Sequence, residues 1–257
     1  MSTTALSQEY RSSAAPPPMI ERFLRDRQGL WQQISQEYDL GRLIWQMFLY
    51  AAAGLACYGA VMGSASGNPL QVLASALKLP LLFLLTLMVC MPTFYLYNLL
   101  FGGHVSARQT LALMLSAITI TSIFTLAFAP ITLFFLVTVT SFNLFILINM
   151  LVLSMSSSVG LLFLIYAVRR FNELAPTDGA TLEARESDLH GAAPPPRINP
   201  AMVYVWFVIA LLIGAQLIWT LQPFFGSTGG GFELFLRPEN SNFFRGLRST
   251  LTQLLAG

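Results

Sequence analysis

The chain has 257 residues, of which 55% are apolar and only 10% are charged, and its formal net charge at pH 7 is +2. This composition is too apolar for an ordinary soluble domain and is typical of integral membrane proteins. The basic residues are scattered along the chain, which excludes the basic patch that a nucleic-acid-binding protein needs.

The N-terminal region is polar. Residues 1–18 end in three consecutive prolines and predict a flexible arm. Within residues 19–42, apolar side chains such as Trp31 and Ile34 recur at helical spacing between charged ones, which predicts an amphipathic helix on the cytoplasmic side. Because its acidic and basic residues nearly balance, the pattern fits a helix in the membrane interface and a helix packed on the protein itself equally well.

The first predicted membrane span runs from about Leu43 to Gly63. It contains a series of small residues at intervals of three or four positions, namely Ala52, Ala56, Gly59 and Gly63. Small residues let two helix backbones approach closely, and close packing is the main source of association energy inside a bilayer. We therefore expect a helix-packing face here, and the pattern leaves open whether the partner helix belongs to this chain or to another.

The second predicted span runs from Leu79 to Phe101, after a short helical stretch that Pro69 opens. It contains Pro80 and Pro92. A proline in mid-helix removes a backbone donor, so Pro92 is expected to kink the span.

Sixty uncharged residues follow, from Gln109 to Val168, and they could form two spans or three. Polar residues between 138 and 143 favour two, with a break near 140 and a return from Phe142. Two spans here give five in total, whereas three give six. The five-span arrangement places more of the basic residues on the cytoplasmic side, as the positive-inside rule prefers.

The remaining chain is expected to contain one more span. Residues 171–199 are charged and rich in proline and predict a cytoplasmic loop, and residues 200–222 predict a fifth span with Trp206 and Trp219 near its two ends. Residues 223–257 predict a tail on the outer face. Its amphipathic surface helix would place four apolar side chains on one side, those of Phe243, Phe244, Leu247 and Leu251.

The fold expected from these patterns is an all-α, polytopic bundle of transmembrane helices, with a four-span membrane body over residues 43–170. We expect a multi-pass protein of the bacterial inner membrane with a cytoplasmic N-terminus. Its expected partners are the lipid bilayer and other membrane proteins or a second copy of itself.

The predicted spans contain no acidic or basic side chain, which argues against proton relays and voltage sensors. The two histidines fall in predicted loops and the two cysteines in apolar segments, so we expect no metal site, no cofactor and no catalysis. The intramembrane polar candidates are Asn98, Thr119, Ser122, Asn149, Ser157 and Gln216. They would either form hydrogen bonds between helices or line a path for a neutral or lipidic solute.

Three short segments carry a resemblance to a known group of proteins. Residues 77–83 (LKLPLLF), 108–113 (RQTLAL) and 219–224 (WTLQPF) resemble uncharacterised bacterial membrane proteins that look distantly like the Yip1 superfamily. The resemblance covers roughly residues 40 to 250. It implies a five-span protein with a cytoplasmic N-terminus that acts through partner contacts without catalysis, and it assigns no functional residue.

Two functions fit these observations. The first is a non-enzymatic scaffold or accessory subunit of a membrane complex, which would contact its partners through Ala52, Ala56, Gly59 and Gly63. The alternative is a permease or channel for an uncharged or lipidic substrate. It is suggested by Pro92, Pro130 and the many hydroxyl side chains of the third and fourth predicted spans.

Overall fold

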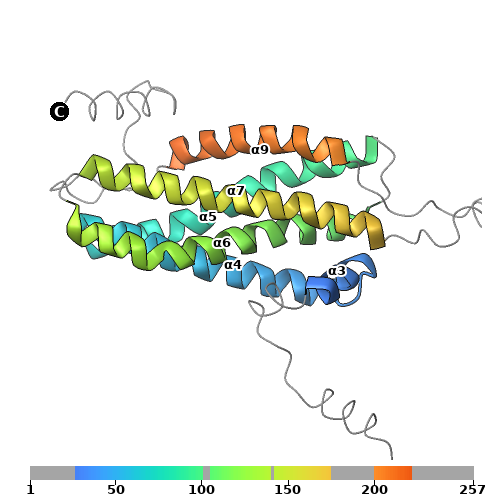
Figure 1. The fold of residues 1–257 in the computed structure, drawn as a ribbon, viewed down its shortest axis with the longest axis horizontal. Coiled ribbons are helices and arrows are strands. Elements are labelled where there is room, and N and C mark those ends of the chain that lie inside the picture. Colours follow the sequence, from blue (N-terminus) through green and yellow to red (C-terminus); the bar gives the residue numbers. More distant parts are fainter. Residues whose placement is uncertain (1–26, 101–104, 140–141, 175–199, 222–257) are drawn as a thin grey trace, which may run out of the picture.

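The computed structural model describes residues 27–100, 105–139, 142–174 and 200–221, and within them the chain is helical with no strand (Figure 1). The elements are α3 (Arg27–Ser35), α4 (Leu40–Gly63), the short 3-10 helix η1 (Ser64–Ser66), α5 (Pro69–Leu100), α6 (Ala107–Thr138), α7 (Phe142–Leu174) and α9 (Pro200–Leu221). The predicted all-α helix bundle is confirmed. The expected N-terminal arm, the proline-rich loop and the tail with Phe243, Phe244, Leu247 and Leu251 lie outside the described residues.

The long helices alternate in direction. In Figure 1, α4, α6 and α9 begin at the end of the bundle where α3 lies, and α5 and α7 run back toward it. Helix α4 packs on α5 and α6, α6 packs on α7, and α9 packs mainly on α5. This alternation brings Arg42, Arg108 and Arg169 to the same end of the bundle, the end that the five-span prediction assigns to the cytoplasm.

Four segments are long and apolar enough to cross a membrane: Leu40–Ser66, Pro69–Leu100, Ala107–Thr138 and Leu144–Glu173. The chain thus has the helices of a multi-pass integral membrane protein. Helix α9 has 22 residues, and its apolar segment Val203–Leu217 is shorter than the other four. At about 1.5 Å per residue α9 measures about 33 Å, close to the roughly 30 Å of bilayer hydrocarbon.

The sixty uncharged residues form two helices. Helix α6 ends at Thr138, where Val139 takes an extended conformation and donates its N–H to the carbonyl of Phe135, and α7 begins at Phe142. The predicted break therefore falls where the polar residues 138–143 suggested. This segment supplies two spans, as the five-span count requires.

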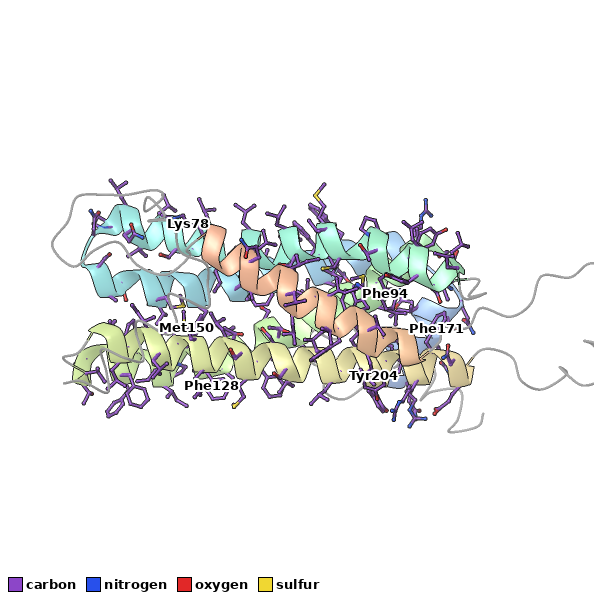
Figure 2. The ribbon with its side chains drawn as sticks, turned by 90° about the horizontal axis from the view of Figure 1, so that it is seen from above. Lys78, Phe94, Phe128, Met150, Phe171 and Tyr204 are labelled. Atoms are coloured by element: carbon purple, nitrogen blue, oxygen red, sulfur yellow. The ribbon has the colours of Figure 1, made fainter. Side chains whose placement is uncertain are left out.

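Helix α5 begins earlier than the predicted span, because the short stretch opened by Pro69 and the span from Leu79 form one continuous helix, Pro69–Leu100. Both inner prolines lie inside it, as expected. Pro69 occupies the first helical position, where its missing N–H costs nothing, and no glycine interrupts the residues that follow. At 32 residues the helix is about 48 Å long, so it extends beyond the hydrocarbon at its ends. Lys78 lies within it, 8% exposed, toward the end of the bundle opposite Phe171 (Figure 2).

The N-terminal amphipathic helix also has different bounds. The sequence predicts a helix within residues 19–42, whereas in the described part α3 ends at Ser35 and α4 begins only at Leu40. Between them, Glu37 and Asp39 have φ angles of 56° and 47°, in the left-handed region. Two such residues so close together break the helix and turn the chain.

The apolar side of α3 packs on the protein itself. Trp31 and Ile34 are 2% and 0% exposed, and the Trp31 ring lies 5.4 Å from that of Phe163 on α7. The Gln109 side-chain amide on α6 donates to the carbonyls of Ile34 and Ser35, at 3.3 and 3.2 Å. Of the two placements left open by the sequence, the structure shows the one in which the helix packs on its own chain.

Candidate functional site

The glycines of the predicted packing face contact α5 of the same chain. A Cβ atom added at Gly59 would lie 2.5 Å from the carbonyl oxygen of Ser75, and one added at Gly63 would lie 2.8 Å from the Cα of Val72. These distances leave no room for a side chain, so the two glycines hold α4 and α5 together. The sequence left open whether the partner helix belongs to this chain or to another, and for these two glycines it is α5 of this chain, while Ala52 and Ala56 are only half-buried.

Two of the intramembrane polar candidates join α6 to α4. The Thr119 hydroxyl lies 2.9 Å from the carbonyl of Leu115 in its own helix and 3.4 Å from that of Met47 on α4. The Ser122 hydroxyl donates to the carbonyl of Ala51, at 3.1 Å. Both side chains are buried, and they form the interhelical hydrogen bonds that the sequence offered as one reading.

A third candidate, Asn149, belongs to a buried network that the sequence did not reveal. The Tyr58 hydroxyl on α4 donates to Oδ1 of Asn149, at 2.9 Å, and lies 3.1 Å from the hydroxyl of Thr132 on α6. Asn149 in turn donates to the carbonyl of Phe145, at 2.8 Å. A tyrosine in the middle of a span needs a hydrogen-bond partner for its hydroxyl, so the position of Tyr58 in the sequence could have indicated this network. The network ties α4, α6 and α7 together, so these groups do not line a polar path.

The other three candidates have different surroundings. Asn98 on α5 is 4% exposed, and within the described part of the chain neither its amide nitrogen nor its amide oxygen has a hydrogen-bond partner. Gln216 lies on the exposed side of α9. Ser157 is half-buried and lines the cleft described next, which makes it the only one of the six to do so.

A cleft of about 510 Å³ lies between α5, α6, α7 and α9. Its walls are overwhelmingly apolar, and its main lining residues are Leu82, Leu87, Met114, Ala117, Ile118, Leu153, Leu161, Leu164, Trp206 and Ala210. Some lining residues, among them Ser154, Leu211 and Leu212, are exposed, so the cleft opens onto the surface of the bundle. An apolar cleft of this size in the membrane-spanning part of a protein is a candidate binding site.

Three of the five hydroxyl groups along the cleft are directed into their own helices. Thr86 donates to the carbonyl of Leu82 at 2.7 Å, Thr121 to that of Ala117 at 3.0 Å, and Ser158 to that of Ser154 at 2.8 Å. The cleft therefore presents mainly hydrocarbon to whatever enters it.

Helix α9 crosses the cleft obliquely. Figure 2 shows it running from Tyr204, above α7, toward the part of α5 that carries Lys78. Trp206 of α9 makes two contacts with α5. Its indole N–H donates to the carbonyl of Cys90 at 3.0 Å, and its ring meets that of Phe94 edge-on, with centroids 5.1 Å apart. On α7, Nη2 of Arg169 donates to the Tyr204 hydroxyl at 3.1 Å. These contacts hold α9 at the end of the bundle nearest α3, and the cleft lies beyond them.

In the described ranges, no three histidine, cysteine or carboxylate side chains lie close enough to hold a metal ion. Cys90 is buried beside the cleft and Cys57 is exposed on α4. The residues brought together here thus offer apolar surface and fixed hydrogen bonds. Comparison of the chain with protein-family models, with curated proteins and with solved structures finds no match.

Proposed function

We propose that this chain is a non-enzymatic membrane protein that takes the hydrocarbon part of a lipidic ligand into the cleft between α5, α6, α7 and α9. The observation that carries the proposal is the apolar cleft of about 510 Å³ in the membrane-spanning part of the bundle, with exposed residues at its edge. This proposal follows the second function suggested by the sequence, a permease or channel, and it limits the substrate to a lipid.

The size of the cleft supports occupation by hydrocarbon. Its volume of about 510 Å³ lies within the roughly 300–1,000 Å³ typical of ligand pockets, and the exposed residues at its edge leave it open to lipid tails. A polar solute would lose most of its hydrogen bonds to water here, because the walls are overwhelmingly apolar and three of the five lining hydroxyls already donate to their own helices. An acyl chain has no such cost.

The experiment that tests this proposal fills the cleft with a large side chain. Gly214 lines the cleft, and a Cβ atom added there meets nothing within 4 Å, so Gly214→Phe places a large side chain in the open space. Gly41→Phe is the matched control, because Gly41 also has nothing within 4 Å and does not line the cleft. Lipids that remain bound after detergent purification are counted by native mass spectrometry. We expect Gly214→Phe to lose one bound lipid that the wild-type protein and Gly41→Phe both retain. Equal retention by the wild-type protein and the two variants would refute the proposal.

The scaffold or accessory-subunit function is the second candidate. It is favoured by Ala52 and Ala56, which are small residues on α4 and are only half-buried. Distant Yip1-like ancestry, proposed from the sequence, agrees with action through partner contacts. Recovery of a stoichiometric membrane partner that Ala52→Leu with Ala56→Leu abolishes would support this function, and recovery of monomer alone would oppose it.

We further propose that the protein resides in the bacterial inner membrane with its N-terminus in the cytoplasm. The support is the common position of Arg42, Arg108, Arg169 and Arg170 at the α3 end of the bundle, since arginine near span ends favours the cytoplasmic side. A reporter that is active only in the cytoplasm, fused to the C-terminus, should be inactive. Activity would refute the proposed orientation, because α9 begins at the α3 end of the bundle.

A further inference from the structure

We infer that the ligand of the cleft is an anionic phospholipid whose phosphate binds at Arg169 and Tyr204. This inference rests on the proposed function, because it places the acyl chain of the same lipid in the cleft. It adds the headgroup class and the residues that would recognise it.

Arg169 and Tyr204 lie at the end of the cleft. Leu164 on α7 and Trp206 on α9 line it, and Arg169 follows Leu164 by five residues, or about 7.5 Å along the helix. Tyr204 precedes Trp206 by two residues, and its hydroxyl accepts a hydrogen bond from Arg169 at 3.1 Å. The pair thus bridges α7 and α9 just beyond the last apolar residues of the cleft.

The two neighbouring arginines differ in what they contact. Arg170 forms an ion pair with Glu173 at 2.8 Å and lies over the Tyr166 ring, 5.5 Å from its centroid. For Arg169, the hydrogen bond to Tyr204 is the only hydrogen bond or ion pair of the side chain among the described residues. A guanidinium has five N–H donors in a planar fork that suits phosphate, so Arg169 keeps most of its donors for a ligand.

Tyr204 complements this arrangement. Because its hydroxyl oxygen accepts from Arg169, its own proton is available to a phosphate oxygen, and the side chain is 49% exposed. A phosphate at this position would therefore meet a charged donor and a neutral one, from two helices. Hydrogen bonds to a charged acceptor are roughly twice as strong as neutral ones.

The length of the cleft fits one acyl chain from the leaflet on the α3 side. On α7 its lining extends from Met150 to Leu164, which is about 21 Å of helix. One leaflet contributes about half of the roughly 30 Å of hydrocarbon. A lipid with its phosphate at Arg169 can thus lay one chain along the cleft to slightly beyond the bilayer centre.

The local charge selects the headgroup. The described carboxylate nearest in sequence, Glu173, is already paired with Arg170, so a zwitterionic headgroup would bring its cation toward two arginines without a counter-charge. An anionic headgroup has no such cation. We therefore expect phosphatidylglycerol or another anionic phospholipid to be preferred over phosphatidylcholine.

The test uses the full chain in nanodiscs that contain equal amounts of phosphatidylglycerol and phosphatidylcholine with identical acyl chains. Bound lipids are identified by native mass spectrometry after release from the nanodisc. We expect the wild-type protein to retain the anionic lipid with about tenfold preference, which Arg169→Gln reduces to near unity and Tyr204→Phe reduces in part. Arg108→Gln is the matched control, since Arg108 is exposed at the same end of the bundle on α6, and it should keep the preference.

The outcomes separate the two proposals. Gly214→Phe should remove both lipids, whereas Arg169→Gln should change only their ratio. Equal retention of the two lipids by the wild-type protein, or an undiminished preference in Arg169→Gln, would overturn the headgroup inference and leave the cleft function standing. Retention of no lipid by the wild-type protein would overturn both. Millimolar inorganic phosphate should not displace the lipid, because the acyl chain holds it, and displacement would show a site for free phosphate instead.

Discussion

Replacing Gly59 by alanine should destabilise the bundle, although alanine is the better helix former. The added methyl carbon would lie 2.5 Å from the carbonyl oxygen of Ser75 and 3.0 Å from the Cα of Ala76, and both are backbone atoms of α5. Reaching an ordinary contact of 3.4 Å requires the two helices to separate by about 0.9 Å. A gap of that size removes a quarter to a half of the dispersion energy of the contacts that it opens.

The expected magnitude follows from two opposing terms. Overpacking of a well-packed interior typically costs about 1–3 kcal/mol, and the gain in helix propensity from glycine to alanine returns at most about 1 kcal/mol. We expect Gly59→Ala to lower the free energy of unfolding by about 1–2 kcal/mol. Unfolding by sodium dodecyl sulfate in mixed micelles, followed by circular dichroism, measures the difference.

Gly214→Ala is the control for this substitution. It makes the same chemical change in a helix, but its added Cβ meets nothing within 4 Å, so it should be neutral or slightly stabilising. If Gly59→Ala proved as stable as Gly214→Ala, the close approach of α4 and α5 at Gly59 would not exist, and the reasoning would fail.

Three further substitutions test the buried polar groups by the same unfolding assay. Tyr58→Phe removes the hydroxyl that donates to Asn149 and should cost about 0.5–1.5 kcal/mol, while a change below 0.2 would show that the network is not needed. Gln109→Ala removes the amide that holds α3 and half of the capping box at the start of α6, so Trp31 should become exposed and its fluorescence should shift to longer wavelength. Asn98→Leu should raise the stability by about 1 kcal/mol, because both polar atoms of the buried amide lack partners, and a loss would point to a ligand at that amide.

The spans could be predicted from the sequence because burial in hydrocarbon imposes a simple rule on composition. A stretch without charges and of sufficient length must be a helix, and the break at residues 139–141 is marked by polar side chains. The continuous α5 was missed because the predicted span began at Leu79, after the charged Lys78, whereas the helix of the structure runs through Lys78, which is buried. Composition marks where an uncharged segment ends, but it does not show whether the helix continues through the charged residue.

The candidate site was less predictable, because the sequence shows which residues are polar but not what they face. Thr119 and Ser122 form hydrogen bonds to α4. Of the six polar candidates, Ser157 is the only one that lines the cleft. Gly54 and Gly160 were not singled out, yet an added Cβ at either would collide with a hydroxyl of α6, that of Ser122 or that of Thr121. The cleft itself arises from the oblique crossing of α9, and such an angle depends on side-chain packing that no periodicity records.

The position of α9 has a consequence for how the protein is made. Translation delivers α4 to α7 to the bilayer before α9, so for a time the surface of α5 around Cys90 and Phe94 faces lipid tails. When α9 docks through Trp206, it forms one wall of a cleft whose other walls have already faced lipid tails. Under the proposed function, the first occupant of the cleft therefore comes from the membrane into which the chain is inserted.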